Sequence, residues 1–146
     1  MRAFTNILKV LVIVFWLVSI TTDKFIEPVQ GQHGDGFLGK KTVRVQNDLG
    51  NGVTLFVQCR SKDDDLGPHY LSNGQYQEWS FINSVFGVTL FWCNIGWNDV
   101  KKSFIVYNVD RDGHVCGSRC WRSIKSDGAY FYHQYERGQW VMEIKW

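Results

Sequence analysis

Closely spaced turn signals constrain the fold of this chain more than any other sequence feature. Clusters rich in Gly, Asn and Asp punctuate the chain from residue 41 onward, at 49–52, 72–74, 98–99, 110–113, 126–128 and 137–138. The segments between them are short, and none shows a long apolar period of 3.6 residues. Short segments with turns about every 8–12 residues favour an antiparallel sandwich or barrel.

Two of these segments alternate apolar and polar residues in the manner of half-buried strands. In residues 53–60 the odd positions can share one buried face, and they are Val53, Leu55, Val57 and Cys59. At the C-terminus the even positions are apolar, and they are Trp140, Met142, Ile144 and Trp146. The other expected strands are 42–47, 75–82, 88–97, 103–109, 120–125 and 129–135. We therefore predict an all-β fold, an antiparallel β-sandwich of about eight short strands stapled by two disulfides.

The first twenty-two residues have the order of a secretory signal. Arg2 and Lys9 precede the apolar run Val10–Val18, and small residues follow it. A membrane anchor is the alternative, but the uncharged run ends after thirteen residues, short of the roughly 20 that span a bilayer. We predict a signal peptide at 1–22, a glycine-rich flexible leader at 23–40 and one domain at 41–146. The mature protein is then extracellular and not embedded in a membrane.

Removal of this segment leaves the charges balanced. The chain has 16 Lys and Arg against 14 Asp and Glu, and residues 1–22 contain two of the bases and none of the acids. A balanced chain without a basic patch does not fit nucleic-acid binding.

The four cysteines all lie in the predicted domain. They are Cys59, Cys93, Cys116 and Cys120, and an even number in a small secreted chain predicts disulfides. Structural zinc is the alternative, but only one of the gaps between them is short, and we predict no metal site. Three connectivities are possible. We expect Cys116 and Cys120 each to bond a cysteine on a different strand.

No constellation of catalytic residues stands out. The stretch RSKDDDLGPH places Asp63, Asp64 and Asp65 side by side in a polar turn, where water and nearby bases keep all three ionised. Acid–base hydrolysis needs two carboxyl groups in different environments, and calcium loops need a different spacing of acids. The four histidines form no metal-binding motif. We predict neither enzymatic activity nor a cofactor.

Aromatic residues offer two interpretations. Phe91, Trp92 and Trp97 could form an exposed platform for sugars, whereas aromatic residues on alternating strands are more often core. The core interpretation is the prediction.

Several motifs together resemble one family. They are VRVQNDL at 43–49, LFVQCRSKDDDLGPH at 55–69, TLFWC at 89–93, Cys120-Trp121 and Asp127-Gly128. In this order and spacing they resemble the plant self-incompatibility proteins, the S-protein homologues, over residues 41–146. The resemblance implies a small secreted plant β-sandwich with two disulfides and no known catalytic activity. The founding members are pistil ligands that meet a receptor on pollen.

The resemblance also implies roles for particular residues. Structural roles are expected for Asn47, Asp65, Leu66, Gly67, Trp92 and Trp121. Asp65 is expected to cap the backbone of its turn, in which Gly67 can take a positive φ. Asp63 and Asp64 are expected to face solvent as a recognition loop.

The function that follows is recognition outside the cell. We expect a monomeric signalling ligand bound by an unidentified membrane receptor through surface loops, with 61–69, 97–102 and 109–113 as candidates. The alternatives are a secreted defence or carbohydrate-binding module and a small secreted hydrolase.

Overall fold

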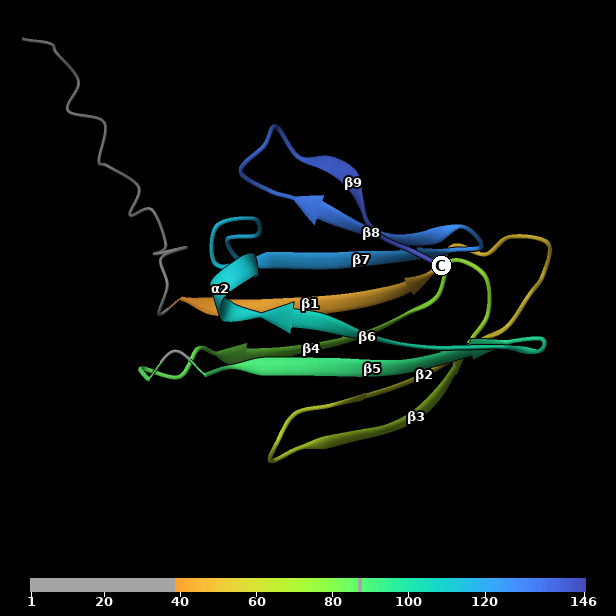
Figure 1. Cartoon of the computed structure of the whole chain (residues 1–146), viewed down its shortest axis with the longest axis horizontal. Coiled ribbons are helices and arrows are strands. Elements are labelled where there is room, and N and C mark those ends of the chain that lie inside the picture. The colour runs from red at the N-terminus through yellow and green to blue at the C-terminus, as the bar shows by residue number, and fades with distance from the viewer. Residues whose placement is uncertain (1–38, 87) are drawn as a thin grey trace, which may run out of the picture. The chain divides into compact units, whose positions relative to one another are not determined.

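Two β-sheets pack face to face in the computed structural model, which describes residues 39–86 and 88–146 (Figure 1). The five-stranded sheet has the order β4 (Tyr76–Ile82), β1 (Lys40–Asn47), β7 (Arg119–Lys125), β8 (Gly128–His133), β9 (Gln139–Lys145). The four-stranded sheet has the order β3 (Asp65–Leu71), β2 (Leu55–Arg60), β5 (Leu90–Trp97), β6 (Val100–Asn108). One helical turn, α2 (Val109–Asp112), follows β6. The predicted all-β sandwich is confirmed, while the signal segment 1–22 and leader residues 23–38 lie outside the described residues.

The core forms where alternate residues of both sheets meet. Leu55, Val57 and Cys59 are fully buried, as the alternation in 53–60 predicts. β5 likewise buries every second residue, so Phe91 and Trp97 are only 6% and 9% exposed. These two aromatic residues belong to the core, and the sugar platform that their sequence positions suggested is not present there.

The structure has one strand more than expected, because β3 occupies a segment that the sequence assigns to a loop. The sequence DLGPHYL contains Gly67 and Pro68 and does not alternate, so it has the composition of a turn. β3 is an edge strand that pairs only with β2. Proline is tolerated at an edge because its missing N–H costs no ladder hydrogen bond there.

One strand pair is parallel, which an antiparallel sandwich does not predict. β1 pairs with β7 in parallel register, with Val43 opposite Cys120, and pairs with β4 in antiparallel register on its other side. All other pairs in the two sheets are antiparallel. A parallel neighbour requires a long crossover, and here the intervening chain contains the whole four-stranded sheet.

The last strand buries less than its alternation predicts. Trp140 and Met142 are exposed, whereas Ile144 and Trp146 pack against the core. β9 is the edge of the five-stranded sheet, and its register with β8 shifts between Ala129 and Tyr130. Such a shift strengthens the twist of the strand, so only the C-terminal half of β9 packs against the core.

Two disulfides are present, as predicted, but their expected connectivity is wrong. Cys59 bonds Cys93, directly opposite on the neighbouring strand β5. Cys116 bonds Cys120, four residues further along the chain. The turn between α2 and β7 brings these two Cα atoms to 5.1 Å, a separation that suits a disulfide. A local turn therefore outweighs the expectation that close neighbours bond elsewhere.

Candidate functional site

Three connections meet at one end of the four-stranded sheet. The β2–β3 turn (residues 61–64) follows Arg60, which lies opposite Trp92 near the start of β5. The β4–β5 loop, residues 83–89, leads into β5, and α2 follows Asn108, which lies opposite Leu90. We call these three connections the loop end, which lies at the left of Figure 1. The candidate loop 97–102 lies at the opposite end, around the β5–β6 turn.

The β2–β3 turn is closed by a serine. Ser61 Oγ accepts hydrogen bonds from the backbone N–H groups of Asp63 (3.3 Å) and Asp64 (3.0 Å). The Ser61 N–H donates to the Asp64 carbonyl at 2.8 Å. Both aspartates are exposed, and neither forms an ion pair with another described residue. The turn therefore presents two adjacent carboxylates to solvent on a fixed backbone.

Asp65, at the start of β3, has a different environment. Its Oδ1 accepts from the Gly67 N–H at 2.9 Å, and its Oδ2 accepts from Arg60 Nε at 2.8 Å. The hydrogen bond from Gly67, followed by that from Arg60, lowers the pKa of Asp65 below its usual value. Gly67 has φ of 75°, a left-handed conformation that favours glycine. Leu66 beside it packs partly against the core.

Asp65→Asn is expected to lower Tm by roughly 2–4 °C at pH 7, as loss of an ionised cap would. The folded-state pKa of Asp65 is lowered, so its stabilisation is present above the unfolded-state pKa and is lost as pH falls through the folded-state value. The Tm values of wild type and variant should therefore begin to converge as the pH falls below about 4. Asp63→Asn with Asp64→Asn is the control, with a shift within about 1 °C. A constant gap across the pH series would show that the charge of Asp65 is not responsible.

The end of β4 and the β4–β5 loop carry exposed apolar residues that the sequence motifs did not reveal. The exposed fractions are 66% for Ile82, 71% for Val85, 87% for Phe86 and 76% for Val88. Single exposed apolar residues are ordinary, but four exposed ones within seven residues of the sequence indicate an interaction site. The sequence signal was available in INSVFGV at 82–88, where no polar residue interrupts the second half.

Hydrogen bonds hold the base of this loop. The Tyr107 hydroxyl donates to Asn83 Oδ1 at 2.8 Å, and the Ser84 N–H donates to Thr89 Oγ1 at 2.8 Å. The Phe86 N–H donates to Ser84 Oγ at 3.2 Å. Because these contacts satisfy polar groups within the loop and anchor it to β6, Phe86 projects from a supported backbone.

The remaining residues singled out by the sequence lie away from the loop end or beneath it. Asn47 is fully buried, and its Nδ2 donates to the carbonyls of Val53 (2.7 Å) and Leu71 (2.8 Å). Trp121 lies on the five-stranded sheet, stacked on Tyr132 with ring centroids 5.5 Å apart. Trp92 is half-buried, opposite Arg60 and Ile105 in its sheet.

Candidate metal clusters and membrane-spanning helices are both absent from the described residues. Among residues 39–86 and 88–146, no group of three or more His, Cys, Asp or Glu could hold a metal ion. Within the same residues no helix has the length and apolar character to cross a bilayer.

Comparison with known proteins identifies a family that matches most of this chain. Residues 42–146 match the family described as plant self-incompatibility protein S1. This chain belongs to that family. S-protein homolog 29 of Arabidopsis thaliana is 45% identical over 97 residues, covering 66% of this chain and 71% of that protein. Self-incompatibility protein S1 of Papaver rhoeas is 36% identical over 101 residues, covering 68% of this chain and 73% of that protein.

A solved structure supports the fold of this S-protein homologue. It belongs to the self-incompatibility protein homologues, described as a widespread family of small, highly stable, secreted proteins from plants. The TM-score is 0.51 at 19% identity, covering 73% of this chain and 96% of that one. The family that this chain belongs to is thus one of secreted plant proteins, as the sequence predicted.

A buried ion pair in this S-protein homologue was not identified from the sequence. Asp112 and Arg122 are both fully buried, with Arg122 Nη2 at 3.0 Å from Asp112 Oδ1. Arg111 Nη2 (2.7 Å) and the Asn108 N–H (2.8 Å) donate to Asp112 Oδ2. Arg122 also donates to the Val106 carbonyl and lies over the Phe131 ring at 3.9 Å. The cluster ties α2 to β7 and β8 beneath the loop end.

Proposed function

We propose that this S-protein homologue is an extracellular ligand that a membrane receptor recognises through the loop end. The observation that carries the proposal is the exposed apolar group formed by Ile82, at the end of β4, and Val85, Phe86 and Val88 on the hydrogen-bonded loop that follows. Interfaces derive most of their affinity from a few apolar or aromatic anchors buried in pockets of the partner. In this proposal the protein acts as a monomer and performs no catalytic step.

The acidic turn at the same end favours a protein partner over a lipid surface. Asp63 and Asp64 are exposed next to the strand that pairs with β5. Their negative charge opposes approach to an anionic bilayer, whereas a pocket bordered by basic residues complements both the charge and the apolar group. The proposed receptor site is therefore an apolar pocket with a basic rim.

Phe86→Ser is expected to weaken binding to receptor-bearing plant plasma-membrane vesicles by about 30-fold, as loss of an interface anchor does. Asp63→Asn with Asp64→Asn should slow association several-fold at low salt and less at high salt. The measurement is binding of the labelled secreted protein to vesicles before and after protease treatment.

Met142→Ser is the matched control, since it removes an exposed apolar side chain from β9 in the other sheet. Binding by this variant should equal that of the wild type. Unchanged binding by Phe86→Ser, or binding that survives protease treatment of the vesicles, would contradict the proposal.

A further inference from the structure

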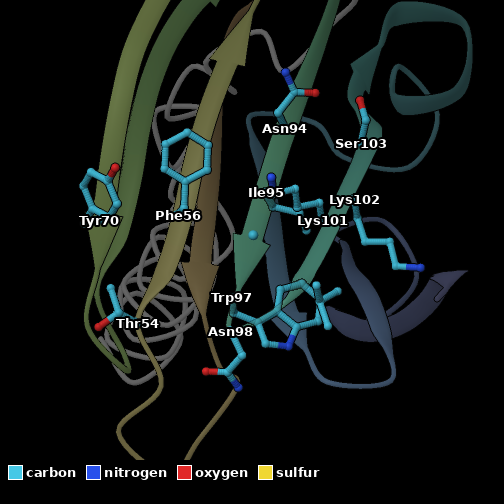
Figure 2. A pocket seen from close by; sticks show the side chains of 12 residues that line it. Thr54, Phe56, Tyr70, Asn94, Ile95, Trp97, Asn98, Lys101, Lys102 and Ser103 are labelled. Atoms are coloured by element: carbon cyan, nitrogen blue, oxygen red, sulfur yellow. The ribbon is translucent and has the colours of Figure 1, made fainter.

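A groove with a volume of about 840 Å³ lies on the four-stranded sheet, away from the loop end (Figure 2). Its walls come from β2, β3, β5 and β6 and from the β5–β6 turn. Its volume is in the range of sites for small molecules or short oligomers. None of the residues that line this groove belongs to the loop end.

The groove is hollow because one position across the sheet lacks a side chain. Strand register places Tyr70, Phe56, Gly96 and Lys101 in one row across the four strands. Gly96 leaves a gap in this row between the Phe56 ring and the Lys101 stem. A Cβ at Gly96 would lie 3.3 Å from the Val100 carbonyl oxygen, so the backbone of Val100 leaves little room for a side chain at this position.

Aromatic rings form one wall. Phe56 and Tyr70 have ring centroids 5.4 Å apart, and Tyr70 is 72% exposed. The ring faces carry partial negative charge, so they attract the weakly positive C–H faces of sugar rings. A wall of this kind suits a ligand with flat C–H faces better than a plain aliphatic chain.

The next row of the sheet supplies polar groups. Asn94 lies opposite Ser103 and both line the groove. Their amide and hydroxyl can donate and accept hydrogen bonds. Together with the aromatic wall they fit a ligand that alternates apolar faces with hydroxyl groups.

The charge of the lining selects among such ligands. Lys101 and Lys102 are the charged residues that line the groove. In Figure 2 Lys101 reaches across the groove toward Phe56, whereas Lys102 points away. A single ammonium directed into an otherwise uncharged groove favours a ligand with a carboxylate.

We propose that this groove binds a uronic acid oligosaccharide, a carboxylated sugar chain. A sugar ring stacks on Phe56 and Tyr70 above Gly96, its carboxylate pairs with Lys101, and its hydroxyls bond with Asn94 and Ser103. The site is distinct from the loop end, so the protein has one surface for a receptor and another for an acidic glycan.

The test is calorimetric or NMR titration of the secreted protein with oligogalacturonate. Lys101→Gln is expected to weaken binding about tenfold, the effect of losing one charge-assisted contact, and Tyr70→Ala by a similar factor. Binding should weaken further as salt is raised. A neutral cello-oligosaccharide and polyglutamate should each bind at least tenfold more weakly than oligogalacturonate. Phe86→Ser, at the loop end, should bind the oligosaccharide as the wild type does.

Several results would overturn the proposal. One is the absence of binding at millimolar oligogalacturonate. Another is equal affinity for the neutral sugar or for polyglutamate, since the first would remove the role of charge and the second the role of the sugar ring. A third is wild-type affinity in both Lys101→Gln and Tyr70→Ala. Lys101→Gln should leave Tm unchanged, and Tyr70→Ala should lower it only slightly, because the contact that it removes is the ring pair with Phe56. None of these outcomes bears on receptor binding by the loop end.

Discussion

Replacement of Asp112 by alanine should destabilise the domain by about 3–5 kcal/mol, the usual cost of leaving a buried charge without its partner. Arg122 is fully buried, and burial lowers its pKa to about 10, an effect that Asp112 partly opposes. Arg122 therefore stays cationic at neutral pH. Without Asp112 its charge would lie beside Phe131 with backbone carbonyls as its remaining close partners.

The measurement is urea or thermal unfolding of the secreted protein. Asp110→Ala is the matched control, because Asp110 lies on the same helical turn and is exposed; its effect should stay within about 0.5 kcal/mol. A cost for Asp112→Ala as small as that of the control would mean that water compensates the charge of Arg122, contrary to the expectation.

The two disulfides should differ in their contribution to stability, even though all four cysteines are fully buried. The Cys59–Cys93 bond spans 34 residues and the Cys116–Cys120 bond spans four. Closing a longer loop removes more entropy from the unfolded chain, which predicts losses of about 4 kcal/mol and about 2 kcal/mol respectively when each bond is removed.

The two double variants Cys59→Ala with Cys93→Ala and Cys116→Ala with Cys120→Ala isolate this difference. Each removes the same number of sulfur atoms from the core, so the packing loss is similar and the loop length is the main variable. Unfolding midpoints should rank the first variant as the less stable. The reverse order would show that Cys116–Cys120 stabilises the native turn before β7 rather than the unfolded chain.

Local alternation predicted the strands, whereas contacts between distant segments escaped prediction. β2 buries Leu55, Val57 and Cys59 because their spacing alone sets which face they share. β3 was missed because Gly67 and Pro68 are turn residues that an edge strand tolerates. The connectivity of the cysteines was wrong because it depends on the path of the chain between α2 and β7, which has no periodic pattern.

For the candidate sites, too, local features could be predicted from the sequence and contacts between distant segments could not. The acidic turn was visible as DDD at 63–65, and the geometry of Asp65 depends on neighbours within a few residues. The groove depends on the register that aligns Phe56 with Gly96 and Gly96 with Lys101, and register cannot be read from a single strand. The pairing of Asp112 with Arg122 similarly requires α2 to lie against β7.

The parallel pairing of β1 with β7 affects the order in which the protein can assemble. β1 lies between β4 and β7, so the centre of the five-stranded sheet cannot form until residues 119–125 have been synthesised. Until then one edge of β1 has no partner, and an open edge of this kind promotes pairing between chains. Contacts between such distant segments also slow folding. A nascent chain paused before β7 should therefore bind chaperones of the secretory pathway, and release of residues 119–146 should end that binding.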